Sequence, residues 1–246
     1  VKWRLAGEPI AGHLKLPLPV WGLGVGGLFG YHFFYFFALR NAPPIEAGLI
    51  AYMWPLLIVL FSALLPGERL RWWHTAGAIT GFAGAVLLVT GGRGLAGFNS
   101  AFSLGYAMAV ACALTWSLYS VTNRRFSSVP TDAVGGFCAV TAILAALCHF
   151  GFEQTVWPQT PGQWLAVLGL GLLPVGAAFF TWDYGTKHGN IQALGALAYA
   201  APLISTIVLI AAGKGTASWS VAIACAMIIG GAVIASKDML SAPPPE

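Results

Sequence analysis

Charged residues are scarce in this chain. Only 8% of its 246 residues are charged, whereas 58% are hydrophobic. A soluble domain carries roughly 25% charged residues because its surface must face water, so a soluble globular protein is excluded. The apolar stretches are continuous, without the alternation that marks membrane β-strands, and many are long enough to cross a bilayer as helices. The sequence therefore predicts an all-α, polytopic membrane protein.

Cysteines and reactive clusters are few as well. The four cysteines are scattered through apolar stretches and form no CxxC pair. They indicate small packing residues rather than a metal or redox site. An intramembrane enzyme would need a nucleophile–base pair or a metal cluster, and a channel would need a polar filter motif. We therefore expect no catalysis, no cofactor and no metal, and we attribute the net charge of +4 to loop residues rather than to nucleic-acid binding.

Eight apolar stretches approach the ~20 residues that a helix needs to cross the hydrocarbon layer. They are residues 18–39, 44–65, 73–90, 102–121, 133–151, 164–186, 191–212 and 217–235. With the N-terminal stretch in the cytoplasm, nine of the twelve Lys and Arg residues fall on the cytoplasmic side. The positive-inside rule then predicts that the N and C termini are both cytoplasmic.

The chain contains an internal repeat. Shifted by 147 residues without gaps, Ala51-Tyr52 and Pro55-Leu56 align with Ala198-Tyr199 and Pro202-Leu203. Matches also occur in the flanking spans, so the same register holds across three consecutive helices. The matched spans lie five crossings apart, so the two copies run in opposite directions through the membrane. Such inverted repeats are typical of secondary transporters, in which the substrate binds between the halves.

The repeat predicts the domain organisation. The second copy, at 93–238, has five spans, whereas the first, at 1–92, has only the last three. We therefore expect a native protein of ten helices, of which eight are visible here and two N-terminal ones are missing. Residues 239–246, with the sequence MLSAPPPE, are expected to form a disordered tail.

Several motifs resemble a known family. The loop Pro66-Gly67-Glu68-Arg69-Leu70, the glycine-rich stretch at 77–89 and the repeat are similar to the drug/metabolite transporter superfamily, in its EamA branch. The aromatic-rich interior resembles the bacterial aromatic amino-acid exporters of the YddG type. This resemblance implies a ten-helix basket around a central cavity, in the bacterial inner membrane. It also implies export of a small metabolite, with aromatic amino acids as the leading candidates.

Aromatic residues within the spans are the candidate substrate-binding side chains. A buried Tyr hydroxyl or indole N–H needs a polar partner, so such residues are expected to face the bundle interior or water. Several convergent ones would suit a flat apolar substrate with polar ends. The predicted substrate-binding residues are Tyr31, His32, Tyr35, Tyr52, Trp54, Trp116, Tyr119 and Tyr199.

Prolines and glycines within the spans predict the shape of the path. Pro55 and Pro202 each remove a backbone donor and are predicted to bend their helices, as a gate pivot or as a static kink. Small residues spaced by four are expected to let helices pack closely. These small faces are Gly22, Gly26 and Gly30, and Gly77, Gly81 and Ala85.

His32 and Asp183 are the candidate functional groups among the titratable residues of the spans. A titratable group is costly in a membrane and is usually there for function. His32 is expected to contact a substrate carboxylate, to pass a proton or simply to be hydrogen-bonded inside the bundle. Asp183 is expected to form a snorkelling pair with Lys187.

The expected partners are a small-molecule substrate and the lipid bilayer, with facilitative or weakly coupled alternating access. The alternative is another solute, such as other amino acids, purines or drugs, with proton coupling.

Overall fold

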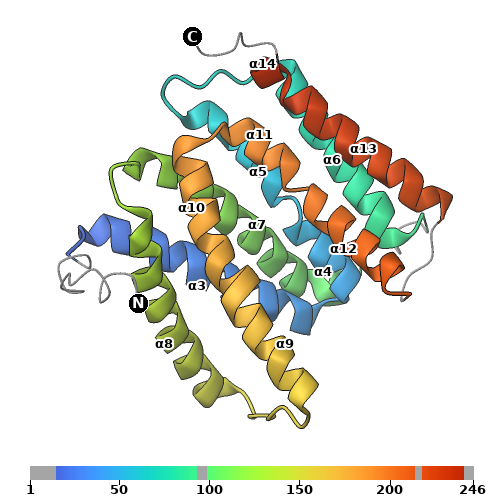
Figure 1. Ribbon diagram of the computed structural model, residues 1–246. Coiled ribbons are helices and arrows are strands. Elements are labelled where there is room, and N and C mark those ends of the chain that lie inside the picture. Colours follow the sequence, from blue (N-terminus) through green and yellow to red (C-terminus); the bar gives the residue numbers. More distant parts are fainter. Residues whose placement is uncertain (1–14, 93–98, 214–217, 241–246) are drawn as a thin grey trace.

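A computed structural model describes residues 15–92, 99–213 and 218–240, and every regular element in these ranges is a helix (Figure 1). The first half contributes α3 (Leu18–Asn41), α4 (Pro44–Ala51), α5 (Trp54–Phe61) and α6 (Trp72–Thr90). The second half contributes α7 (Ser103–Asn123), α8 (Val134–Phe152), α9 (Pro161–Leu172), α10 (Ala178–His188), α11 (Ile191–Leu197), α12 (Ala200–Ala211), α13 (Trp219–Ala235) and α14 (Lys237–Leu240). Helix α14 covers the start of the predicted tail, and 241–246 lie outside the described residues.

Within the described residues, seven continuous helical stretches are long and apolar enough to cross a membrane, judged by length and composition. The eighth predicted span corresponds to α13, which is apolar but has only 17 residues. The prediction of an all-α polytopic membrane protein is confirmed. Length and continuous hydropathy sufficed for this prediction because a lipid-exposed backbone must bond within its own helix.

The helices form two packed groups joined by broken helices. Helices α6 and α13 lie side by side at one edge, while α3 packs against α7 and α8 at the other (Figure 1). The pairs α4–α5 and α11–α12 connect these groups, and α9–α10 passes across α7 and α3. The stretch Pro161–His188 is the least covered span. Only 6% of its most apolar 18-residue segment is buried, against 22% to 39% for the other six spans.

Both copies of the Tyr-Pro motif interrupt their helix at the same place. Helix α4 ends at Ala51 and α5 begins at Trp54, whereas α11 ends at Leu197 and α12 begins at Ala200. Proline carries no N–H to donate to the carbonyl four residues earlier, so the helical ladder cannot continue through it. A third interruption is the π-helical segment at Leu173–Ala177, which contains Pro174.

Glycines set the closest helix contacts, but not all of those predicted. A Cβ on Gly77 would lie 2.4 Å from Gly231 O, so α6 and α13 approach almost backbone to backbone. The predicted face of Gly22, Gly26 and Gly30 was wrong in part, because a Cβ on Gly22 or Gly26 would meet nothing within 4 Å. The close contacts of α3 occur instead at its intervening glycines. Gly24 meets Phe137, and Gly27 meets Tyr119.

Neighbouring glycines in α13 give a matched test of this seam. A Cβ on Gly231 would lie 2.6 Å from Gly77 O and 2.7 Å from Gly81 N, whereas one on Gly230 would meet nothing within 4 Å. We expect Gly231→Ala to destabilise the protein by about 1–3 kcal/mol through overpacking, and Gly230→Ala to be nearly neutral. Thermal unfolding of both variants in the same detergent measures the difference. Equal melting temperatures for the two would contradict a backbone-to-backbone seam.

Candidate functional site

Five aromatic residues from both halves of the chain surround Trp116 of α7 and form with it a set of six. We call this set the aromatic cluster. Ring centroids of the other members lie within 6.3 Å of Trp116, at 4.9 Å for Tyr31, 5.3 Å for Tyr119, 5.8 Å for Phe179, 5.9 Å for Trp182 and 6.3 Å for Trp54. Trp116 itself is 6% exposed. The side chains come from α3, α5, α7 and α10, so the cluster lies where the two halves meet.

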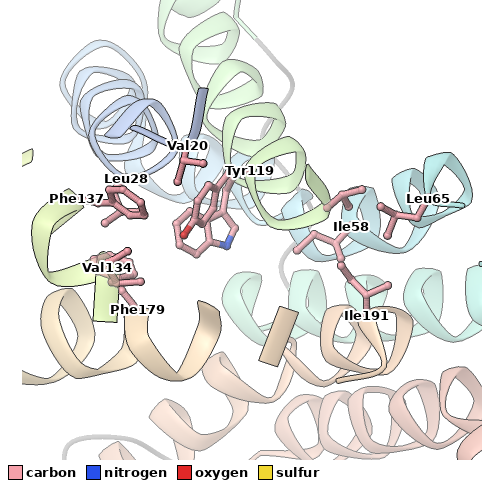
Figure 2. Close-up of a cluster of buried hydrophobic side chains, with 12 residues drawn as sticks. Val20, Leu28, Ile58, Leu65, Tyr119, Val134, Phe137, Phe179 and Ile191 are labelled. Carbon is pink, nitrogen blue, oxygen red and sulfur yellow. The ribbon is translucent and has the colours of Figure 1, made fainter. Parts of the chain in front are cut away.

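Aliphatic side chains hold the aromatic cluster in place. Leu28 of α3, Ile58 of α5 and Val134 of α8 are at most 1% exposed and belong to the same buried core (Figure 2). Figure 2 shows Tyr119 between the Leu28 and Phe137 side of this core and the Ile58 side. Because protein interiors are close-packed, such neighbours restrict the rings to few orientations. The cluster is therefore a fixed wall of aromatic faces and edges.

Most of the predicted substrate-binding residues lie together. Tyr31 stacks on Tyr35 at 6.1 Å, meets the edge of His32 at 5.1 Å and contacts Trp116. Trp54, which follows the break between α4 and α5, meets Trp116 edge to face at 6.3 Å. The structure thus brings six of the eight residues into one set of ring contacts: Tyr31, His32, Tyr35, Trp54, Trp116 and Tyr119.

The other two predicted residues lie elsewhere. Tyr52 and Tyr199 pack in a separate core with Ala85, Leu203 and Ile228. Tyr199 is fully buried, and its hydroxyl accepts a hydrogen bond from the backbone N–H of Leu56 at 3.1 Å. Leu56 lies in the first turn of α5, where backbone donors have no partner within the helix. Tyr199 of one half therefore caps the helix break of the other half.

Sequence reasoning missed two members of the aromatic cluster. Trp182 contacts Trp54 edge to face at 5.3 Å, and its indole N–H donates to Ser120 Oγ at 3.0 Å. Phe179 contacts both Trp116 and His32. The repeat carried a usable signal, because the shift of 147 residues places Trp182 on Tyr35 and Phe179 on His32.

A cavity of about 920 Å³ lies beside the aromatic cluster, bounded by α3, α8 and α9–α10. We call it the side cavity. His32 and Phe179 line it and also contact the cluster, so the two features share a wall. The lining is mainly apolar, with polar groups at one end: Arg40, Asn41, His149 and Glu153. We call that end of the molecule the Arg40 end. Such a volume suits a small organic molecule.

His32 is held by its own helix. Its Nδ1 lies 2.7 Å from the carbonyl oxygen of Leu28, one turn earlier. A carbonyl can only accept, so Nδ1 carries the proton in this contact. In the neutral imidazole Nε2 is then a hydrogen-bond acceptor. The predicted contact of Nε2 with a substrate carboxylate would require the charged form of His32.

Partly exposed charged groups lie at the Arg40 end. Arg40 of α3 and Glu153, just after α8, are 2.6 Å apart, and His149 Nδ1 lies 2.7 Å from the same carboxylate. The hydrogen bond from His149, followed by the charge of Arg40, holds the pKa of Glu153 below its usual range. The side chains of Arg40 and Glu153 remain 59% and 33% exposed. This pair therefore stays ionised and solvated near neutral pH.

A buried polar cluster lies at the opposite end, which we call the Lys187 end. Lys187 Nζ lies 2.9 Å from Asp183 Oδ2, and these side chains are 2% and 0% exposed. The predicted pair is therefore present, but the prediction that it snorkels was wrong. Asn123 and Thr131 also donate to the Asp183 carboxylate, at 2.9 and 2.7 Å. Packing of α7 and the turn before α8 over α10 buries the pair, which sequence spacing alone does not reveal.

The two halves of the chain are also joined at the Lys187 end. Glu68, in the loop between α5 and α6, accepts from Arg124 at 3.0 Å and from Gln192 at 3.0 Å. Arg125 donates to the Leu64 carbonyl at 3.0 Å. These contacts connect the first half to the ends of α7 and α11 in the second half. Among the described residues, the Lys187 end is thus closely bonded and buried, whereas the charged groups at the Arg40 end are partly exposed.

Comparisons with known proteins agree with this architecture. The profile of the EamA-like transporter family matches residues 5–90 and 103–237. The chain is 58% identical to the aromatic amino acid exporter YddG of Ancylobacter novellus over 223 residues, 91% of this chain and 77% of that protein. It is 24% identical to the Escherichia coli protein of the same name, over 80% of this chain and 69% of that protein. A solved structure titled "Crystal structure of protein" superposes with a TM-score of 0.89 at 55% identity, covering 96% of this chain and 81% of the other.

The cap that Tyr199 supplies can be tested by removing one atom. Tyr199→Phe keeps the ring but leaves the Leu56 N–H without its acceptor. We expect a loss of about 1–3 kcal/mol in stability, the cost of an unsatisfied buried donor, measured by thermal unfolding in detergent. Tyr184→Phe, at a side chain 62% exposed, is the matched control and should be nearly neutral. Equal stability of Tyr199→Phe and the wild type would show that the hydroxyl is not needed at the break.

Proposed function

This chain belongs to the EamA-like transporter family, and on that basis we propose that it exports aromatic amino acids by alternating access along the aromatic cluster and the side cavity. The observation that carries the proposal is the convergence of six aromatic side chains from both halves around Trp116. Relatives named as aromatic amino acid exporters support the substrate class. The bacterial inner membrane is the proposed location.

The chemistry of the cluster suits a flat ring with polar ends. Aromatic pairs prefer offset or edge-to-face contacts with centroids 4.5–7 Å apart, and the tryptophans of the cluster already meet one another in this way. A phenyl or indole ring can replace one such contact without a change in polarity. At the Arg40 end, one cation and one anion match the carboxylate and ammonium of an amino acid.

The titratable groups favour facilitated or weakly coupled transport. Strong proton or sodium coupling often uses carboxylates within the membrane that can exchange a proton or ion on the path. Among the described span residues, the buried carboxylate of Asp183 already has a full set of partners in Lys187, Asn123 and Thr131. A proton-coupled transporter of another solute remains the alternative, and His32 would be its first candidate residue.

The repeat also supports two further helices in the complete transporter. Helix α3 packs against both α7 and α8. In the repeat, α3 corresponds to α9–α10, whose surface is the least covered of the spans. Two helices equivalent to α7 and α8 would cover this apolar surface and complete the first repeat, of which 1–92 holds three spans, to match the five-helix repeat at 93–238. The charge distribution supports cytoplasmic termini and an outward-facing Arg40 end.

Trp116→Ala tests the site directly. We expect the rate of tryptophan flux into liposomes, without an ion gradient, to fall about tenfold or more, because the variant loses several ring contacts. Trp116→Phe should retain part of the flux. Trp219→Ala, at a side chain 86% exposed, is the matched control and should transport like the wild type. Normal flux in a folded Trp116→Ala protein would remove the aromatic cluster from the path.

Pro55→Ala tests the role of the helix break. Alanine restores a backbone N–H that can bond to Ala51, so α4 and α5 would tend to join into one straight helix. We expect tryptophan flux to slow several-fold while the melting temperature changes little. Pro44→Ala, in the first turn of the same span where proline is harmless, should leave the flux unchanged. If both variants transport normally, the break is a static feature of the fold.

A further inference from the structure

The repeat relates two cations that lie at opposite ends of the molecule. The shift of 147 residues places Arg40 on Lys187, and both stand in the last turn of their helix, α3 and α10. Lys187 donates to the carbonyl of Val129, just before α8, whereas Arg40 pairs with Glu153, just after α8. Helix α8 has 19 residues and thus a length of about 28 Å. Two positions equivalent in the repeat therefore occupy the two ends of one membrane-spanning helix.

At the closed end the cation is fully engaged. The Lys187 ammonium has two partners, Asp183 Oδ2 and the Val129 carbonyl, each at 2.9 Å. The Asp183 carboxylate also accepts from Asn123 and Thr131. A buried ion pair is tolerated only with good geometry and further hydrogen bonds, and removal of one partner is strongly destabilising. Both residues lie on α10, one turn apart, so the bonds of the pair to Asn123, Thr131 and the Val129 carbonyl hold α10 against α7 and the turn before α8.

At the open end the equivalent cation is solvated. Arg40 and Glu153 line the mouth of the side cavity and are both partly exposed. An exposed ion pair contributes little, commonly below about 1 kcal/mol, because water competes for both charges. The Arg40–Glu153 contact thus joins α3 to the end of α8 only weakly in this state. Closure of the cavity mouth would bury it and strengthen the attraction between its charges.

We propose that Lys187–Asp183 and Arg40–Glu153 are the two gate pairs of the transport cycle, with one buried and the other solvated in each state. The proposal rests on the alternating access proposed above and adds the residues that hold each end closed. In the present state the Lys187 pair is buried and the Arg40 end is open. In the opposite state the Arg40 pair is buried, and water enters at the Lys187 end and separates Lys187 and Asp183 from Val129, Asn123 and Thr131.

Natural cysteines in the side cavity report which end is open. Cys138 and Cys148 line the cavity, with Cys138 near the start of α8 and Cys148 near the mouth. With Cys112, Cys148 and Cys225 replaced by alanine in the full-length protein, Cys138 alone reacts with a membrane-impermeant thiol reagent. Right-side-out and inside-out vesicles present the two ends to the reagent separately. The orientation in which the otherwise unmodified protein reacts faster identifies the Arg40 end.

Neutralising one pair should change the accessibility of Cys138 in a defined direction. In Asp183→Asn/Lys187→Met, we expect modification from the Arg40 end to slow roughly threefold to tenfold, as a two-state population shifts away from the present state. Adding Arg40→Met/Glu153→Gln to that variant should restore the rate, because it weakens the opposite closed state. Arg69→Met, which removes an exposed cation of the α5–α6 loop, is the matched control and should leave the rate unchanged.

Recovery of the Cys138 modification rate in the quadruple variant distinguishes a gating role from a purely structural one. A variant that slows modification because it is misfolded would not recover when a second ion pair is removed 28 Å away, the approximate length of α8. An unchanged Cys138 rate in Asp183→Asn/Lys187→Met, or a quadruple variant that stays slow, would overturn the proposal. Tryptophan flux is measured separately on the same proteins. Absent tryptophan flux with the expected changes at Cys138 would overturn the substrate and leave the gate pairs standing.

Discussion

The structure depends on one constraint: in a bilayer, backbone N–H and C=O groups must be satisfied within the protein. Continuous helices meet this requirement, so most of the chain is helical and uniformly apolar. The interruptions at Tyr52–Met53 and Ala198–Tyr199 are the costly exceptions. The break in the first half is satisfied by Tyr199 from the second half, whose hydroxyl accepts from Leu56. The second broken helix thus stabilises the first only when the two halves are packed together.

The same broken helices position the aromatic cluster. Trp54 begins α5 immediately after its break, and Trp116 and Trp182 reach it from α7 and α10. The side cavity opens from this cluster toward the Arg40 end, while the buried polar cluster closes the Lys187 end. An aromatic wall, a cavity at one end and a buried ion pair at the other are the features on which the proposed alternating access rests.

Much of this architecture follows from the sequence, because membrane crossing requires long apolar runs and a repeat needs only self-comparison. The aromatic faces of α3 and α7 followed from helical spacing. The depth at which each side chain lies and the residues that it contacts did not follow from the sequence, since both depend on packing. Substrate binding by Tyr199 stays a prediction, and its bond to Leu56 inside a separate core was not evident from the sequence. Gly22 and Gly26 were predicted to pack closely and do not, whereas Lys187 is buried by elements more than 50 residues away in sequence. Trp182 was missed, although its repeat equivalent Tyr35 had been singled out.

The central claim is that the aromatic cluster selects a flat aromatic solute that moves without an obligatory ion gradient. Counterflow in liposomes tests it most directly, with the full-length protein, equal ion concentrations on both sides and labelled tryptophan, phenylalanine, threonine and a nucleotide sugar compared side by side. The account predicts saturable exchange of tryptophan and phenylalanine, with little movement of the other two. Preference for threonine or the nucleotide sugar, or flux of the aromatic solutes only under a proton gradient, would contradict it.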